Sequence, residues 1–401
     1  MLLKIKNNYS HTIRACYIGY VTQAIIVNFT PLLFVTFQNS YNIPITQITL
    51  LITGNFAIQL TVDFLAAKFA DAIGYKPLAI VAHILAATGL AGLCILPGVL
   101  PPYIGILIST VLYAIGGGLL EVLISPIVEA CPTDPSKKSA HMSLLHSFYC
   151  WGLVFVIIVS TLFFVIFGIH NWRILALIWA VIPLFNAFYF SQVPIATFTD
   201  NGQTTMSIKS LASTKLFWLL ILLMMCSGES EQAMIQWASM FAESGLKVSK
   251  TVGDLMGPCL FAVLMGISRV GYSKLSDKIN LRIFMIGSGF LCIISYLLAS
   301  LSPNPVIGLI GCSLCGLSVG IMWPGTFSIA AEKCPKGGTA LFALLALGGD
   351  LGCSSGPTLI GMTSGIVGGG IKTGILTGIV FPILLILGLV LLSPRVKTRD
   401  S

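Results

Sequence analysis

Charged residues are scarce in this chain: only 9% of its 401 residues are charged, whereas 56% are hydrophobic. A soluble globular protein carries about 25% charged residues, so this chain has too few to cover the surface of a globule. Apolar runs of about 20 residues, the length that crosses a bilayer as a helix, recur along it. Residues 152–169 and 374–392 are two examples. The composition therefore predicts an integral membrane protein.

The apolar runs also lack the alternation of apolar and polar residues that a membrane β-barrel requires. We predict an all-α integral membrane protein with twelve transmembrane helices. From apolar runs and turn signals, the expected spans are 12–38, 45–67, 77–97, 102–129, 139–167, 173–193, 215–241, 252–271, 282–301, 305–330, 339–361 and 373–393. The first span is too long for a signal-peptide core, so we expect it to remain in the protein.

The few basic residues are distributed unevenly about these spans. With the N-terminus inside, eighteen of the 22 Lys and Arg residues fall inside, and only Arg173, Lys247, Lys250 and Lys372 fall outside. The positive-inside rule then predicts that both termini are cytoplasmic. We expect a multi-pass protein of the plasma (inner) membrane. Its net charge of +8 reflects this topology and does not indicate nucleic-acid binding.

A hydrophilic decapeptide after the second span, AKFADAIGYK (67–76), has a counterpart after the eighth, SKLSDKINLR (273–282). The tetrapeptides EACP and EKCP match in the same order, as do the starts of spans 5 and 11. These matches predict two homologous halves of six spans, related by a pseudo-two-fold axis along the membrane normal. We expect an N-terminal half at 1–193, a cytoplasmic linker at 194–215 and a C-terminal half at 216–401.

The first decapeptide resembles the signature Gly-x-x-x-Asp-Arg-x-Gly-Arg-Lys of the major facilitator superfamily. Asp71, Gly74 and Lys76 match it, whereas Ala67, Ala72 and Tyr75 depart from it; the second copy has Asn280 in place of the Gly. In that superfamily, the Asp caps a neighbouring helix and pairs with basic residues while the carrier is open outward. The resemblance implies gating roles for four residues, namely Asp71, Lys76, Asp277 and Arg282.

Three further segments are similar to the fucose:proton symporters within that superfamily. The Gly-rich span 4 has Glu121 and Pro126 at the family's spacing, with Ser125 in place of its Asn. The stretches LLHSFYCWG of span 5 and GLSVGIMWPGTFSIA of span 10 are also similar. Those symporters place an Asp in span 1, where this chain offers Asn28. Their pair of proton-relaying carboxylates therefore does not carry over whole.

Acidic residues are rare within the spans, and charge inside a bilayer is costly enough to suggest function. The deep acids are Glu121, Glu229, Glu231 and Asp350, whereas Asp63 lies closer to the cytoplasmic end of its span. We take these four as candidates for proton coupling. Glu121 could take up a proton outside and release it inside. Alternatively, it is a permanently protonated hydrogen-bond donor.

Span 7 carries a polar face suited to a solute. On a regular helix Glu229, Gln232 and Gln236 share one face, while Glu231 lies about 200° from Glu229. That face favours Glu229 as the acid in the cavity, unless Gly228 breaks the helix. Amides beside an indole suit a sugar, which has hydrogen-bonding groups and an apolar C–H face. The candidate substrate ligands are Asn28, His146, Gln232, Gln236, Trp237 and Trp323; for each Trp, packing or a lipid-interface position is the alternative.

We therefore expect a secondary active transporter that moves a small polar solute, such as a sugar, by alternating access with proton symport. Sodium coupling stays open, and we expect a monomer without cofactor or metal. The sequence has no His-rich metal set and no Ser-His or paired-Asp constellation, so we do not expect an enzyme. Two alternatives are an efflux antiporter for amphipathic compounds and a non-transporting receptor built on the same fold.

Overall fold

The computed structural model describes residues 8–131, 135–195, 208–275, 279–334, 338–366 and 370–392. Within these ranges, the side chains at 67–69, 71, 72, 129, 135–144, 208, 273–275, 338–340, 342, 343 and 366 lie outside the description. All regular structure in the described ranges is helical, with no β-strand.

The helices fall into twelve stretches of membrane length. The first six are α2–η1–α3 (Tyr9–Asn28, Thr30–Leu33, Phe34–Tyr41), α4 (Ile45–Ile73), α5 (Tyr75–Val99), α6 (Pro102–Ala130), α7 (Pro135–Phe167) and η2–α8 (Ile169–Asn171, Trp172–Gln192). The short α9 (Ile208–Ala212) follows. The last six are α10–α11–η3 (Lys215–Ile235, Ala238–Met240, Phe241–Gly245), α12–η4–α13 (Lys250–Asp254, Leu255–Cys259, Leu260–Leu275), α14 (Leu281–Leu301), α15–α16 (Pro305–Val319, Met322–Lys333), α17 (Gly338–Ile366) and α18–α19 (Gly370–Thr377, Val380–Leu391).

Ten of these stretches are long and apolar enough to cross a membrane. The other two, at 215–245 and 338–366, have membrane length but are more polar, because they carry the Glu, Gln and Asp residues noted above and many glycines. The predicted all-α membrane fold of twelve spans is confirmed. The division into 1–193, 194–215 and 216–401 stays a prediction.

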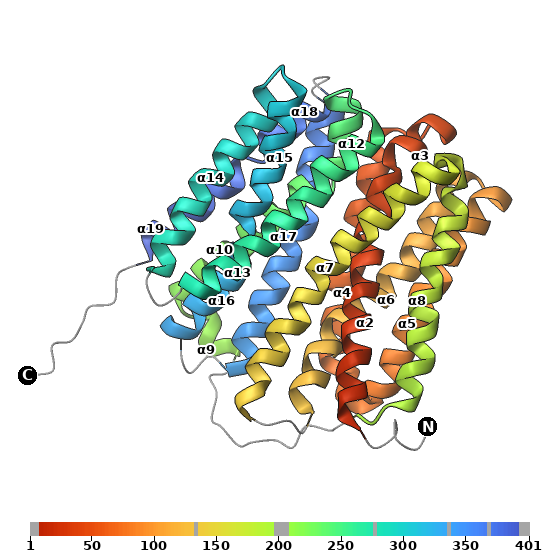
Figure 1. Ribbon diagram of the computed structural model, residues 1–401. Helices are drawn as coiled ribbons and strands as arrows, with labels where there is room; N and C mark the ends of the chain where they lie inside the picture. The colour runs from red at the N-terminus through yellow and green to blue at the C-terminus, as the bar shows by residue number, and fades with distance from the viewer. Residues whose placement is uncertain are drawn as a thin grey trace, which may run out of the picture.

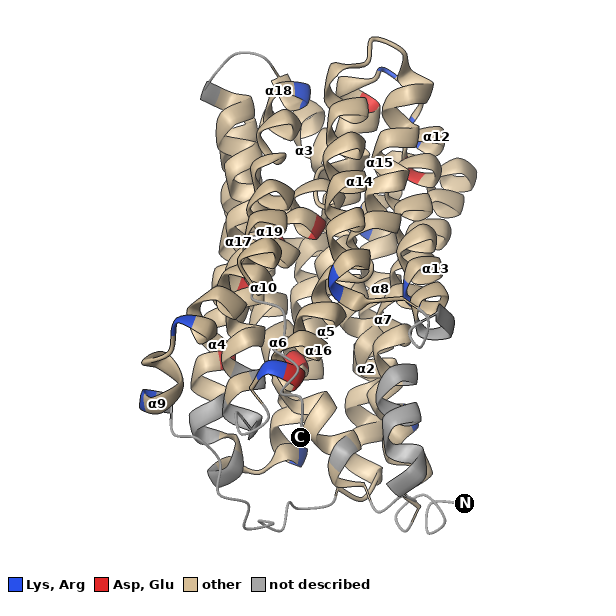
Figure 2. Ribbon diagram, turned by 90° about the vertical axis from the view of Figure 1, so that its left-hand side faces the viewer, with Lys and Arg blue, Asp and Glu red and all other residues tan. Residues whose placement is uncertain are grey.

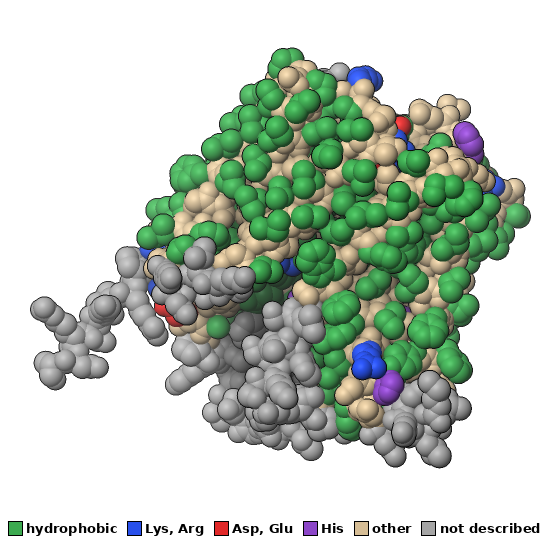
Figure 3. Space-filling view, viewed as in Figure 1, with side chains coloured by type: hydrophobic (Ala, Val, Ile, Leu, Met, Phe, Trp, Pro, Cys, Tyr) green, Lys and Arg blue, Asp and Glu red, His purple; other side chains and the backbone are tan. Residues whose placement is uncertain are grey.

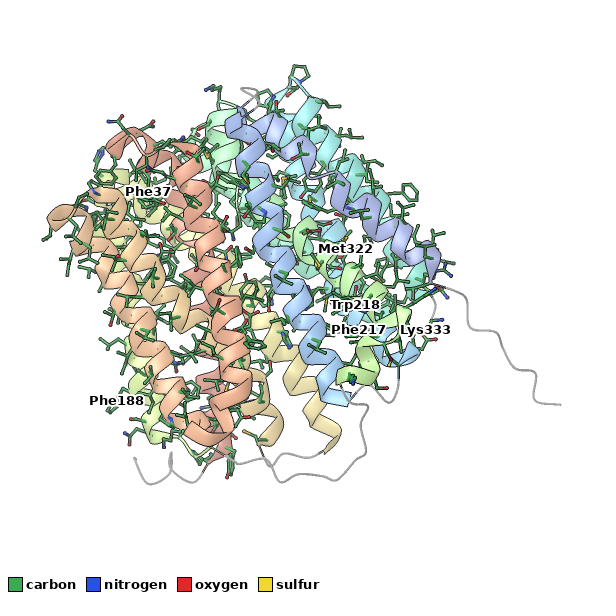
Figure 4. The ribbon with its side chains drawn as sticks, turned by 180° about the vertical axis from the view of Figure 1, so that it is seen from behind. Phe37, Phe188, Phe217, Trp218, Met322 and Lys333 are labelled. Atoms are coloured by element: carbon green, nitrogen blue, oxygen red, sulfur yellow. The ribbon has the colours of Figure 1, made fainter. Side chains whose placement is uncertain are left out.

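Apolar side chains cover the flanks of the bundle, as Figure 3 shows on one face. Phe188 is 64% exposed on the outer flank of the first group of helices, whereas Met322 is fully buried inside the second group (Figure 4). Figure 2 shows that the acidic residues lie at several depths along the bundle. This distribution is expected when the solvent around the flanks is lipid.

The first six spans lie together on one side of the molecule and the last six on the other (Figure 1). The two groups meet where α4 packs on α17 and where α7 packs on η4 and α13. The start of α2 and the end of α19 point to the same side of the bundle, lower in Figure 1. We call this the terminal side and the other the opposite side.

Two connections on the terminal side have local causes in the sequence. Gly74 alone separates α4 from α5, with φ of +97°, a conformation that favours glycine. Asn280 stands at the equivalent place before α14, where its side chain accepts a hydrogen bond from the Ile283 N–H at 3.2 Å. An Asn is a preferred residue at this helix start, which explains why the second decapeptide needs no Gly.

Candidate functional site

A polar network occupies the interior of the first six spans. The Gln23 amide of α2 donates to the Gln59 Oε1 atom of α4 at 2.9 Å and to the Glu121 carboxylate of α6 at 3.2 Å. Gly117 makes this approach possible, because a Cβ atom there would lie 3.0 Å from the Gln23 Oε1 atom. Glu121 is half-buried, whereas both Gln side chains are buried.

The predicted ligands of spans 1 and 5 lie around this network. Asn28 is buried and donates to the Ala24 carbonyl at 3.1 Å and to the Tyr149 hydroxyl at 3.4 Å. The exposed His146 ring lies 5.4 Å from the Tyr20 ring. The Tyr20 hydroxyl in turn lies 3.1 Å from the Ser125 hydroxyl. Tyrosines, which were not among the predicted ligands, thus link α2 to α6 and α7.

The two acids of α10 point in different directions. Glu229 accepts a hydrogen bond from the Ser355 hydroxyl of α17 at 2.8 Å. Glu231 lies 3.7 Å from the Arg269 guanidinium of α13, and Arg269 also donates to the Cys150 sulfur of α7 at 3.1 Å. Glu231 is therefore the acid whose partner reaches the first six spans, whereas the sequence-based preference for Glu229 as the acid in the cavity stays a prediction.

The physical reason for this difference is helix packing and not a helix break. The helix α10 is continuous through Gly228 to Ile235. At the level of Glu229, α17 packs closely on α10: a Cβ atom on Gly356 would lie 2.9 Å from the Glu229 backbone. Further along α10, the Gln236 amide donates hydrogen bonds to the Gln232 Oε1 atom at 3.1 Å and to the Val27 carbonyl of α2 at 3.4 Å.

The two predicted tryptophans differ in access. Trp237 is fully buried; its indole N–H donates to the Pro357 carbonyl at 2.9 Å, and its ring lies 5.7 Å from that of Phe34. Trp323 is half-buried and its ring lies over Gly349, where a Cβ atom would overlap with it. In this conformation Trp237 serves helix packing, whereas Trp323 has a partly open face.

The four predicted proton-coupling acids converge in space. The Cys353 sulfur of α17 lies within electrostatic range of Glu121, Glu229, Glu231 and Asp350. The Asp350 carboxyl group also lies within hydrogen-bonding range of that of Asp63 of α4. Residues far apart in sequence, from α4, α6, α10 and α17, thus form one acidic centre between the two groups of helices.

Of the four predicted gating residues, two have described side chains. The Lys76 ammonium donates to the Val193 carbonyl at 2.9 Å, just past the end of α8. Arg282 donates to the Leu389 and Val390 carbonyls at 2.7 and 2.8 Å, at the end of α19. Each basic group therefore sits at the C-terminus of the last span of its own set of six. The side chains of Asp71 and Asp277 lie outside the described residues.

A second polar cluster on the opposite side was missed by the sequence analysis, which placed Lys250 in a loop. The Lys250 ammonium lies 3.1 Å from the buried Asp254 carboxylate and donates across the interface to the Leu32 carbonyl at 2.5 Å. Leu32 belongs to η1, where Pro31 interrupts the first span. A cavity of about 300 Å³ beside this contact is lined by Glu243, Lys250, Asp254, Thr161 and residues of α3.

Other partners were also missed, and the signal for them was weak. Gln23, Gln59 and Tyr149 are polar residues within expected spans that also hold other polar residues, and Arg269 lies two residues from the end of the expected span 252–271. Polar residues buried inside a membrane bundle tend to bond across helices, so each could have been flagged individually. Their partners could not, because pairing depends on how each helix is rotated.

Residues 16–357 match the family model described as the Major Facilitator Superfamily. Among curated proteins, no relative matches in sequence. Solved structures with a similar fold include a D-xylose–proton symporter, with a TM-score of 0.77 and 14% identity over 97% of this chain and 99% of that one. The nucleoside transporter NupG gives 0.75 and 12% over 95% and 99%. The fucose:proton symporter of E. coli gives 0.66 and 16% over 97% and 100%.

Proposed function

Because the chain belongs to the Major Facilitator Superfamily, and is thus a membrane transporter and not an enzyme, we propose that it moves a small polar solute by alternating access with proton symport. The observation that carries this proposal is the acidic and amide-rich centre between the two groups of helices. Intramembrane carboxyl groups without enough basic partners are typical of proton pathways. Only Glu231 of the four central acids has a described ion-pair partner.

A sugar is the solute class that we propose. Gln23, Gln59, Gln232 and Gln236 supply amide donors and acceptors, and Trp323 supplies a partly open aromatic face. Hydroxyl groups of a sugar match the amides, while its C–H face suits an indole. Two of the similar structures are sugar–proton symporters, which is consistent with the proposal. In this scheme Glu121 is the first candidate for proton coupling, with Glu229, Glu231 and Asp350 as further candidates.

We further propose that the terminal side is cytoplasmic, that the protein resides in the plasma (inner) membrane and that it works as a monomer. The uneven distribution of Lys and Arg supports this orientation, since basic residues favour the cytoplasmic side. Asp71, Lys76, Asp277 and Arg282 would then act at the cytoplasmic ends of the spans during the transport cycle.

The test is uptake of labelled monosaccharides into proteoliposomes, with a proton gradient, with a sodium gradient and without either. We expect at least one sugar to accumulate above its outside concentration only when the proton gradient is present, and protein-free liposomes to take up none. Accumulation driven by a sodium gradient alone would show that sodium, and not the proton, is the coupling ion. If no monosaccharide enters and amphipathic compounds are expelled instead, the proposal of sugar symport is wrong.

A further inference from the structure

The contact between α4 and α17 runs along the interface between the two groups of helices. Near the opposite side, Thr49 packs against Gly361. Further along, the Thr53 and Thr358 hydroxyls lie 2.5 Å apart. Asp63 then meets Asp350, and the two carboxyl groups lie within hydrogen-bonding range of each other. Because α4 and α17 run antiparallel here, this carboxyl pair is the contact of the series nearest the terminal side.

No described side chain around the pair supplies a counter-charge. Asp63 is only 7% exposed, and its Oδ1 atom is buried without a hydrogen-bond partner. None of the ion pairs among the described side chains includes Asp63 or Asp350. The charged group that acts on both is another acid, Glu121 of α6. Glu229 and Glu231 of α10 add negative charge around Cys353, which is close to Asp350 on α17.

Two ionised carboxylates offer only acceptors, so they cannot hydrogen-bond to each other and they repel at close range. One proton between them changes this: the protonated carboxyl group donates a short, charge-assisted bond to the carboxylate. We propose that Asp63 and Asp350 share one proton, and that this proton holds α4 against α17 on the terminal side. We call this contact the Asp63–Asp350 clasp.

The clasp opens when the shared proton leaves to water on the terminal side. The O–H bond breaks, no other covalent bond changes, and two carboxylates remain that repel each other across the interface. Rebinding of one proton restores the bond. This step deepens and rests on the proposed proton symport, because it makes proton release to the terminal side a condition for the two groups of helices to separate there. Asp63 thereby becomes a positioning residue of the transport cycle.

The experiment measures separation directly and needs no solute. Spin labels are attached at Ile73→Cys, at the exposed end of α4, and at the exposed Ser328→Cys of α16. Cys94 and Cys334, the two cysteines that are partly exposed, are replaced by Ser. Distance distributions are recorded by double electron–electron resonance from pH 5 to pH 9. We expect the short-distance peak to dominate at low pH and to be lost as the pH rises.

Four variants test the cause of that loss. Asp63→Asn and Asp350→Asn each leave an amide that donates to the remaining acid, so both should keep the short-distance peak at every pH. Asp63→Glu retains a carboxyl pair and should keep a pH-dependent loss. Thr53→Val removes a hydroxyl contact from the same helix pair without changing any titrating group, so its response should match the parent. Every variant must elute as a single monodisperse peak in size-exclusion chromatography, which shows that it is folded.

The clasp is overturned if the parent shows no change with pH, or if both Asn variants respond as the parent does, since the response would then belong to Glu121 or another group. Failure of the proposed function looks different. If the pH-dependent separation is present and no monosaccharide is taken up, the clasp stands and the assignment of the solute is wrong. If sugar uptake is proton-driven while both Asn variants still separate with pH, symport stands and the clasp is wrong.

Discussion

Glu231 and Arg269 form an ion pair of 3.7 Å between α10 and α13, and the same guanidinium donates to the Cys150 sulfur of α7 at 3.1 Å. Arg269 therefore connects the last six spans to the first six through a single side chain. Its Nε–H group also donates to the Gly320 carbonyl at 3.2 Å, where α15 gives way to α16. A charged group held in this way responds to any movement between the two groups of helices.

Glu231→Gln should lower the stability of the protein, because it leaves the Arg269 charge inside the bundle without its counter-ion. Removing one partner of a buried ion pair costs roughly 3–5 kcal/mol. Since the Arg269 side chain is 28% exposed, we expect a smaller loss, about 1–3 kcal/mol after allowance for solvent screening. Unfolding in detergent with increasing denaturant measures it.

The control for this prediction is the double variant Glu231→Gln, Arg269→Gln, which removes both charges and should recover part of the lost stability. Glu229→Gln, which disturbs the hydrogen bond from Ser355 but no ion pair of the described side chains, should cost less than Glu231→Gln. If Glu231→Gln unfolds at the same denaturant concentration as the parent, the ion pair does not contribute to the folded state.

Glu121→Gln should abolish accumulation of solute and preserve exchange of labelled for unlabelled solute. The amide mimics a protonated carboxyl group, so the loaded carrier can still reorient, but it cannot release a proton. The hydrogen bond from Gln23 at 3.2 Å can persist through the amide oxygen. Both assays use the same proteoliposomes, with Glu229→Gln as the matched acid variant. Accumulation by Glu121→Gln would move the coupling role to Glu229, Glu231 or Asp350; loss of exchange would indicate a solute ligand or a packing residue.

The twelve spans could be predicted because they depend on composition along the chain, which the sequence states directly. The four central acids could also be selected, because charged residues in apolar spans are rare. The partners of these acids could not be predicted, because they are distant in sequence: Gln23 is 98 positions from Glu121, and Asp63 lies far along the chain from Asp350. Such pairings depend on helix rotation and on where glycines allow close approach. The choice between Glu229 and Glu231 as the acid in the cavity stays a prediction, because it too depends on helix rotation.

Trp323→Ala should weaken solute binding, whereas Trp237→Ala should mainly weaken the fold. A desolvated aromatic contact contributes about 0.5–1.5 kcal/mol, so Trp323→Ala should raise the dissociation constant by roughly tenfold or less. Trp323→Phe should keep part of that contact. Truncating a fully buried Trp such as Trp237 typically costs about 3–5 kcal/mol of folding stability. Equilibrium binding and thermal unfolding, measured on the same samples, separate the two effects. Normal binding by Trp323→Ala would exclude it as a solute platform.

Lys250→Met should loosen the contact between the two groups of helices on the opposite side. It removes the donor to the Leu32 carbonyl and leaves Asp254 without its cation. A cysteine placed at Asn39, which lines the adjacent cavity, should then react faster with a membrane-impermeant maleimide. The double variant Lys250→Met, Asp254→Asn controls for the unpaired acid: it should fold better and remain accessible. Unchanged labelling in both variants would show that Lys250 does not hold this side closed.

Lys76→Gln and Arg282→Gln should each weaken the terminal end of their own set of six spans. A cation at a helix C-terminus stabilises the exposed carbonyl groups and the helix dipole by about 0.3–1 kcal/mol. Lys76 acts at Val193 and Arg282 at Leu389 and Val390, so the two share no partner. Their effects on unfolding should therefore add and should shrink at high salt.

Transport provides the second measurement for these two residues. If each basic group also works with the acid of its own loop, Asp71→Asn combined with Lys76→Gln should slow turnover no more than the slower single variant does, and Asp277→Asn with Arg282→Gln should behave in the same way. Lys76→Arg and Arg282→Lys keep the charge and should retain most of the turnover. If the fold-loss of turnover in each double variant equals the product of the losses in its two single variants, acid and base act separately. Parental turnover in all four single variants would show that these two loops have no gating role.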